Sequence, residues 1–187
     1  MKLDHLNDET IKEILMIQDR LKVMDAKAES RDSFLGYIKH VWPEFIEGEH
    51  HRLFAQKLED VAKGKIKRLI VNMPPRHTKS EFASVYFPSW FMGLKPNTKI
   101  MQTTHTAELS VRFGRKVRNL MDQNEYKQLF DDFGLSADSK SAGRWETNKG
   151  GEYFAAGVGG AITGRGADLL IIDDPHSEQD AMSPSAL

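Results

Sequence analysis

Residues 68–80 read Arg68-Leu69-Ile70-Val71-Asn72-Met73-Pro74-Pro75-Arg76-His77-Thr78-Lys79-Ser80, an apolar run followed by a polar loop. A second apolar run, much later in the chain, ends in two carboxylates and reads Leu169-Leu170-Ile171-Ile172-Asp173-Asp174. Both runs have the length and composition of a buried β-strand. Each places a group that handles phosphate or magnesium at the carboxyl end of that strand, where open α/β sheets bind their ligands. The two segments together predict an ATP site.

The polar loop supplies two of the groups that a phosphate-binding loop needs. Such a loop combines converging backbone N–H groups, a lysine for the β- and γ-phosphates and a hydroxyl for magnesium, all at a helix N-terminus. Lys79 and Ser80 are the lysine and the hydroxyl. The usual pattern has glycine at the positions of Met73 and Thr78, so the loop has a variant shape or carries strain of about 1 kcal/mol or more at Thr78. An ordinary surface Lys-Ser pair is the alternative interpretation.

The two carboxylates that end the second run suit a magnesium nucleotide. We assign Asp173 to the metal, usually reached through water, and Asp174 to the positioning or deprotonation of the attacking water. A strand that ends in an Asp-Asp-Pro turn is the alternative. The loop at Lys79 makes this alternative the weaker of the two, because both segments occur in the order that an ATP site requires.

Apolar residues elsewhere in the chain follow helical spacing in some segments and strand spacing in others. Helical spacing continues after Lys79 and also predicts helices over 10–29, 34–42, 50–62 and 107–121. Strand-like runs cover 66–73, 99–103, 152–156 and the residues before Asp173. Residues 134–151 are rich in Ser, Ala, Gly and Asp and predict an irregular connection. Strands that alternate with helices indicate an α/β fold with a parallel sheet and crossover helices.

The composition suits one domain and excludes several kinds of site. A length of 187 residues permits one packed domain, or one domain with an appended helical segment. Lys and Arg number 26 against 27 Asp and Glu, so the net charge is -1 and any contact with DNA must be local. The absence of cysteine excludes disulfides and thiolate metal sites. No apolar run approaches the roughly 20 residues of a membrane span, and no signal-peptide pattern is present, so we expect a soluble, intracellular protein without a membrane contact.

Three segments resemble the ATPase domain of tailed-phage terminase large subunits, and the resemblance extends from about Phe34 to the end of the chain. They are Met73-Pro74-Pro75-Arg76-His77-Thr78-Lys79-Ser80, Gly160-Ala161-Ile162-Thr163-Gly164-Arg165-Gly166-Ala167-Asp168 and Leu170-Ile171-Ile172-Asp173-Asp174-Pro175. The resemblance implies a three-layer P-loop NTPase of the α/β class, with a mostly parallel central sheet preceded by N-terminal helices. Residues 1–63 would then lead into the ATPase domain, and residues 64–187 would form its core. We expect this core to be truncated at the C-terminus, before the nuclease domain of the family.

The resemblance also implies roles for individual residues. The nucleotide-binding Walker A loop of the family corresponds to Pro74-Pro75-Arg76-His77-Thr78-Lys79-Ser80, with threonine where glycine is usual. Within it, Arg76 would bridge phosphate oxygens or sense the γ-phosphate. Arg165 would be an arginine finger that reaches the nucleotide of a neighbouring subunit, and a solvent-exposed loop arginine is the alternative. Ser80 and Asp173 would hold Mg²⁺, and Asp174 would be the catalytic carboxylate where many relatives have glutamate.

The activity that the resemblance implies is ATP hydrolysis that drives double-stranded DNA into a preformed capsid. The implied partners are double-stranded DNA, the portal protein, the small terminase subunit and further copies of the chain in a ring. The implied location is the cytoplasm of an infected bacterial host, at the portal of the procapsid during packaging. Two alternatives stay open, namely another nucleic-acid-dependent ATPase such as a helicase, and a truncated fragment that only binds nucleotide or packaging partners.

Overall fold

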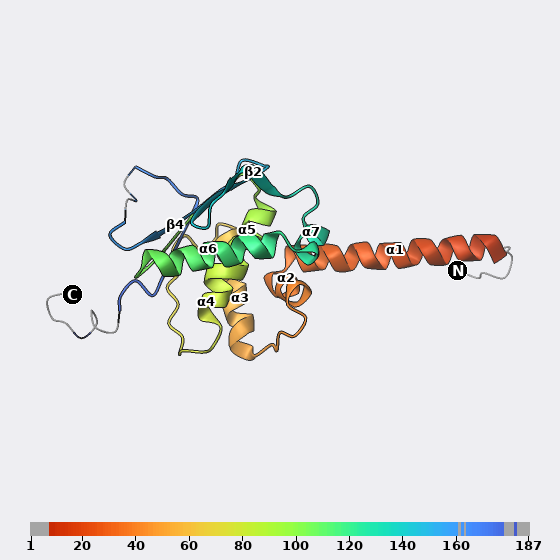
Figure 1. Ribbon diagram of the computed structural model, residues 1–187. Coiled ribbons are helices and arrows are strands. Elements are labelled where there is room, and N and C mark those ends of the chain that lie inside the picture. Colours follow the sequence, from red (N-terminus) through yellow and green to blue (C-terminus); the bar gives the residue numbers. More distant parts are fainter. Residues whose placement is uncertain (1–7, 161, 163, 178–181, 183–187) are drawn as a thin grey trace.

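Helices at the amino-terminal end lead into a helix-covered five-stranded sheet (Figure 1). The structure, a computed structural model, describes residues 8–160, 162, 164–177 and 182. Its helices are α1 (Asp8–Asp32), α2 (Phe34–Val41), α3 (Glu49–Ala62), α4 (Lys79–Glu81), the π-helix η1 (Phe82–Tyr86), α5 (Phe87–Leu94), α6 (Ala107–Met121) and α7 (Asn124–Leu129). Its strands are β1 (Lys99–Thr104), β2 (Leu135–Lys140), β3 (Arg144–Thr147), β4 (Glu152–Gly157) and β5 (Leu169–Asp173).

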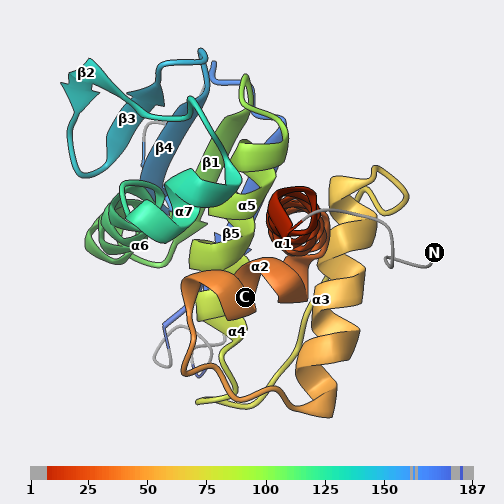
Figure 2. The ribbon, with the colours of Figure 1, turned by 90° about the vertical axis from the view of Figure 1, so that its right-hand side faces the viewer.

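The three N-terminal helices confirm the helices predicted over 10–29, 34–42 and 50–62. The first of them, α1, extends away from the rest of the molecule (Figure 1), and Figure 2 views it end-on beside α3. Ser33 separates α1 from α2, and its hydroxyl accepts a hydrogen bond from the Gly36 N–H at 3.2 Å, which caps α2. In the described part of the chain, no helix has both the length and the apolar character that a membrane span requires.

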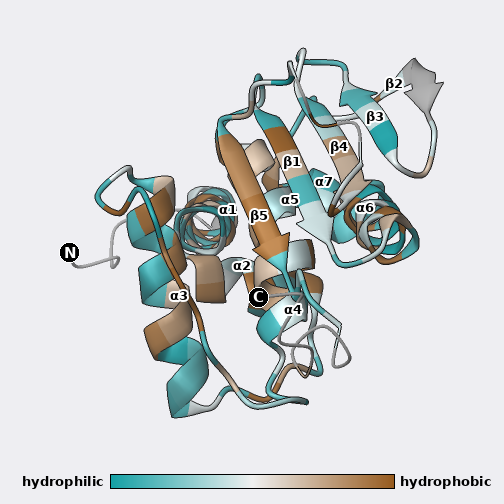
Figure 3. Ribbon diagram, turned by 90° about the vertical axis from the view of Figure 1, so that its left-hand side faces the viewer, coloured by the Kyte–Doolittle hydropathy of each residue, from teal (hydrophilic) through white to brown (hydrophobic). Residues whose placement is uncertain are grey.

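The sheet is mixed, which corrects the prediction of a mostly parallel P-loop sheet. Its strand order is β2-β3-β4-β1-β5. β1 pairs in parallel with β4 and with β5, whereas β2 with β3 and β3 with β4 are antiparallel pairs. The helices that pack on the sheet lie behind it in Figure 3, so the described residues form two layers at the sheet and not three. The predicted fold class was therefore wrong.

The physical reason is the segment 134–151, for which an irregular connection was predicted. It forms β2 and β3, joined to each other and to β4 by tight turns, and a connection this short can only join antiparallel neighbours. The first turn closes where the Ser141 hydroxyl accepts from the Arg144 N–H at 3.0 Å. The second passes through Gly150, whose φ of 82° suits glycine. The small polar residues of this segment concealed two strands.

The prediction of a strand over 66–73 was also wrong, although side chains there alternate between half-buried and exposed as they would in a strand. Residues 66–73, all of which the structure describes, form no strand and run beside α3 toward α4 (Figure 3). Leu69, Val71 and Met73 are half-buried against the core, whereas Ile70 is 87 % exposed. The segment is thus extended and packed on one side without joining the sheet.

Aromatic side chains fill the space between the helices and the sheet. Phe34 of α2 is wholly buried and contacts Phe82 edge-to-face, with 5.6 Å between ring centroids. On the sheet, Trp145 stacks on Tyr153 at 4.8 Å, and the Tyr153 hydroxyl donates to Gln102. Burial raises the pKa of Tyr153 far above its usual value. This core fixes β1, β4 and β5, whose carboxyl ends carry the candidate site.

Candidate functional site

The two segments that predicted an ATP site meet in the structure. Lys79 begins α4, while Asp173 is the last residue of β5 and Asp174 follows it. The Lys79 Nζ lies 2.7 Å from Asp174 Oδ1 and 4.0 Å from Asp173 Oδ1. Asp173 pairs in the sheet with Thr104, the last residue of β1, so the contact lies at the carboxyl edge of parallel strands. The second segment thus ends a strand at this edge, as the sequence predicted, whereas the first segment reaches it without forming a strand.

Asp173 is held more tightly than its neighbour. Its side chain is 7 % exposed, and its Oδ2 accepts a hydrogen bond from the wholly buried Ser84 Oγ at 2.8 Å. Asp174, whose side chain is 64 % exposed, has a positive φ of 42°, and its carbonyl accepts from the His105 N–H at 3.1 Å. The buried carboxylate therefore has a fixed orientation, and the exposed one faces Lys79 and solvent.

Ser84 is a site residue that the sequence analysis missed. It lies in the π-helix η1, where the Phe87 N–H bonds to the Phe82 carbonyl five residues earlier. Pro88 follows, and because proline has no N–H, it cannot donate to the Ser84 carbonyl as an α-helix would require. Single π-turns of this kind often occur at functional sites. The only signal in the sequence was a serine within the apolar run after Glu81.

Of the two alternatives for the polar loop before Lys79, the structure has the one with backbone strain at Thr78. Thr78 has φ 61° and ψ 14°, the left-handed conformation that glycine adopts without cost and a β-branched residue does not. Its Oγ1 lies 2.8 Å from Nε2 of His51, a buried residue on the first turn of α3. Arg76 also has a positive φ, of 63°, and its side chain is exposed, as are Pro74, Pro75 and His77. The nucleotide roles predicted for residues 74–80 stay predictions.

Oxygen donors at this edge suit magnesium. Ser80 follows Lys79 in α4, and Asp173 supplies a carboxylate, which are the ligand types that Mg²⁺ prefers beside water and phosphate oxygens. Among the residues that the structure describes, no group of three or more His, Cys, Asp or Glu side chains is placed to hold a metal. A magnesium ion here would therefore depend on a bound triphosphate for further ligands.

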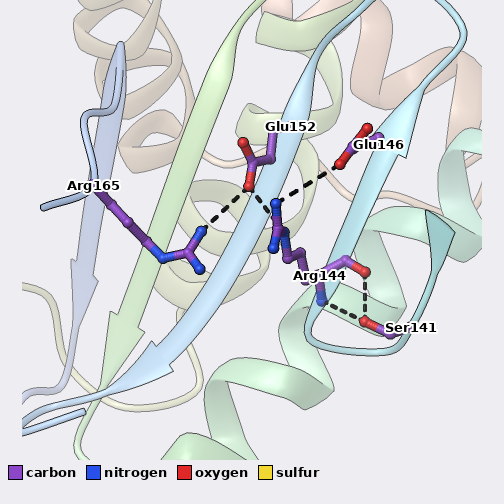
Figure 4. A network of polar contacts seen from close by, with 5 residues as sticks. All are labelled: Ser141, Arg144, Glu146, Glu152 and Arg165. Atoms are coloured by element: carbon purple, nitrogen blue, oxygen red, sulfur yellow. Dashed lines mark hydrogen bonds and ion pairs between the residues drawn. The ribbon is translucent and has the colours of Figure 1, made fainter. Parts of the chain in front are cut away.

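Arg165 lies at the other end of the sheet (Figure 4). Its Nη1 is 3.5 Å from Glu152 Oε1, which also pairs with Arg144 Nε at 3.1 Å. The Arg165 guanidinium lies over the Phe154 ring, 4.1 Å from the centroid. Glu152 begins β4, and β4 spans six residues, about 16 Å at roughly 3.3 Å per residue. The structure thus does not bring Arg165 to the Lys79 site of its own chain, and its role as an arginine finger stays a prediction.

The described site joins a lysine, a hydroxyl and two carboxylates at one sheet edge. A lysine beside two carboxylates can exchange them for phosphate oxygens, and the freed carboxylates can then bind a metal or polarise water. Searches against protein-family models, curated proteins and solved structures found no match. The functional interpretation of the site therefore rests on the residues and contacts of this chain.

Proposed function

We propose that this chain is the ATP-hydrolysing motor part of a tailed-phage terminase large subunit. In this proposal ATP hydrolysis drives double-stranded DNA into the capsid. The observation that supports ATP hydrolysis most directly is the contact of Lys79 Nζ with Asp174 Oδ1 at 2.7 Å, with Asp173 beside it. The terminase assignment is supported by the resemblance of the segments around Lys79, Arg165 and Asp173.

The chemistry proposed for the site follows from what each side chain offers. Lys79 would leave the acidic pair and meet the β- and γ-phosphates of ATP, because a triphosphate carries more negative charge than one exposed carboxylate. Asp174 would then be free to orient the attacking water and accept its proton. Ser80 and Asp173 would hold Mg²⁺, which neutralises the phosphate charge when bound. Ser84 would keep Asp173 in one orientation through the hydrogen bond to its Oδ2.

Arg76 and Arg165 have separate places in the proposal. Arg76 lies in the loop and would contact the phosphates of its own nucleotide. Arg165 is held by Glu152 and Phe154 at the opposite end of the sheet, so it would serve the nucleotide of a neighbouring copy in a ring. The partners we propose are double-stranded DNA, the portal protein and the small terminase subunit, at the procapsid portal in the host cytoplasm.

The proposal is tested by magnesium-dependent ATP binding and hydrolysis, with and without double-stranded DNA. We expect Lys79→Ala to lose nucleotide binding and Asp174→Asn to bind nucleotide without hydrolysing it. Lys127→Ala is the matched control, because Lys127 also pairs with an aspartate, Asp122, at 2.6 Å but on α7. The control should behave as the unaltered chain does. Absence of nucleotide binding by the folded chain, or equal loss of binding in all three variants, would contradict the proposal.

A further inference from the structure

His51 joins the first turn of α3 to the phosphate loop through directed hydrogen bonds. Its Nδ1 accepts from the Gly48 backbone N–H at 2.8 Å, so the ring proton of the neutral side chain must be on Nε2. Nε2 therefore donates to Thr78 Oγ1 at 2.8 Å. The Thr78 hydroxyl in turn donates to the His77 carbonyl at 2.6 Å. These three bonds have one consistent direction and fix the side-chain rotamer of Thr78.

The residue held in this way is the one with the strained backbone. Thr78 has φ 61° at the position immediately before Lys79, and this conformation costs of the order of 1–3 kcal/mol for a residue other than glycine. Strain of this size persists only where surrounding contacts determine the conformation. The hydroxyl of Thr78 has two such contacts, one to His51 and one to its own chain neighbour. A glycine at this position would need neither.

The surroundings of His51 bury its ring and favour the neutral form. The ring is 6 % exposed and lies against Phe45 and Phe82, with centroids 4.8 and 5.1 Å away. Burial lowers the pKa of His51 most, and the nearby His50 and His77 lower it too, whereas Glu47 opposes them. Phe82 is the first residue of η1, so the His51 ring contacts the residue that directly follows α4, the helix that carries Ser80.

We infer that His51 is a positioning residue, which holds Thr78 in the left-handed conformation so that threonine serves in the phosphate loop where glycine is usual. The inference rests on the proposed function for its consequence, nucleotide binding, but the hydrogen bond itself does not depend on nucleotide. His51 touches neither Lys79 nor the acidic pair in the described contacts. Its effect on the site passes through Thr78.

The test measures how tightly a magnesium-bound, non-hydrolysable ATP analogue binds to four chains. These are the unaltered chain, His51→Ala, Thr78→Gly and the double variant. We expect His51→Ala to weaken binding about fivefold or more, the loss expected for one hydrogen bond. Relative to Thr78→Gly alone, adding His51→Ala should change binding less than twofold, because glycine needs no partner to keep the left-handed conformation. If His51 served only the packing of α3, His51→Ala would weaken binding equally in the unaltered chain and in the Thr78→Gly variant. That result would overturn the inference.

Two further variants separate the hydrogen bond from the fold. His51→Gln keeps a donor near the position of Nε2 and should recover part of the binding that His51→Ala loses. His40→Ala is the control, because His40 bonds to the Glu125 carbonyl at 3.1 Å on another face of the molecule. This control should leave binding unchanged. Equal weakening by His51→Ala and His51→Gln would count against the inference.

Measurements without nucleotide distinguish failure of the inference from failure of the proposed function. Nitrogen-15 spectra of the histidine rings should show His51 protonated at Nε2 only. Urea unfolding of the same four chains should show that His51→Ala lowers the folding equilibrium constant several-fold more in the unaltered chain than in the Thr78→Gly variant. If both the spectra and the unfolding comparison give the expected results and no nucleotide binds, the proposed function fails and the inference stands. If the loss is equal in both backgrounds, the inference fails whatever the nucleotide result.

Discussion

Ser84 donates a hydrogen bond to Asp173 although the two residues are 89 positions apart in the sequence. The Oγ to Oδ2 distance is 2.8 Å, and both side chains are buried. A buried carboxylate oxygen without a hydrogen-bond donor carries a large desolvation cost, and this bond offsets part of that cost for Asp173. It also leaves Oδ1 facing Lys79.

Ser84→Ala should therefore affect both stability and metal dependence. We expect a loss of about 1–3 kcal/mol in the free energy of unfolding, because the buried Asp173 oxygen loses its donor. The magnesium concentration that gives half-maximal nucleotide binding should rise. Ser89→Ala is the control, since Ser89 is also buried and hydrogen-bonded, to the Tyr37 hydroxyl at 2.7 Å, but lies in α5. That variant should lose stability without any change in magnesium dependence.

Asp174→Asn should leave stability almost unchanged. The Asp174 side chain is 64 % exposed, and exposed ion pairs such as the one with Lys79 contribute about 0–1 kcal/mol. Urea unfolding should thus give a free energy within about 1 kcal/mol of the unaltered chain. A much larger loss would mean that the carboxylate has a structural role, and the loss of hydrolysis in this variant would no longer identify a catalytic group.

Arg165→Ala should be inactive alone and partly active when mixed with Lys79→Ala. In a mixed ring, a subunit with intact Lys79 would receive Arg165 from a neighbour, so hydrolysis should recover at intermediate ratios. Arg144→Ala is the matched control because both arginines pair with Glu152, and it should retain activity alone. Complete absence of recovery at every mixing ratio would exclude a finger that acts between subunits.

Gly157→Ala should destabilise the fold, whereas Gly166→Ala should not. A Cβ at Gly157 would lie 2.5 Å from the Ala107 backbone nitrogen, where the end of β4 meets the start of α6. Overpacking against backbone costs typically about 1–3 kcal/mol. A Cβ at Gly166 meets no atom within 4 Å. Thermal unfolding of the two variants compares them directly, and equal melting temperatures would contradict the close approach of β4 to α6.

Stability should fall as the pH decreases below the usual pKa of histidine, in part because of His51. Burial lowers the pKa of His51 in the folded protein, so the unfolded chain binds its proton at a higher pH than the folded chain does. Above about pH 7 both states are neutral and the effect vanishes. Below about pH 6.5 the unfolded state gains the proton first and stability declines. Urea unfolding from mildly alkaline to mildly acidic pH should show a steeper decline for the unaltered chain than for His51→Gln.

The sequence predicted the parts of the fold that have strong periodicity. The helix expected over 107–121 is α6, and the strands expected over 99–103 and 152–156 are β1 and β4. The apolar residues of α6 repeat at helical spacing, whereas β1 and β4 are short runs that are buried over most of their length. Residues 134–151 have no such repeat, so β2 and β3 were missed and the sheet was expected to be mostly parallel.

The candidate site was predictable only where one residue type determines the chemistry. Lys79 and Asp174 were found because a lysine after a polar loop and a carboxylate after an apolar run indicate nucleotide chemistry. Ser84 and His51 were not predicted as site residues, since their roles depend on contacts of 2.8 Å with residues distant in the sequence. His50 and His51 are adjacent in the sequence, but His51 is the one whose ring bonds to Thr78 in the described contacts. Their different roles follow from the fold and not from their spacing.

The position of β5 at one side of the sheet affects how the protein will behave in a concentrated sample. Within the described residues β5 is the last strand in the order, and on it Leu170 and Ile172 are 54 % and 58 % exposed. An apolar edge strand offers its backbone hydrogen-bonding groups to other chains and promotes intermolecular β-structure. No charged side chain interrupts the run from Leu169 to Ile172. The strand that carries the acidic pair therefore also offers an apolar edge through which the molecule can start to aggregate.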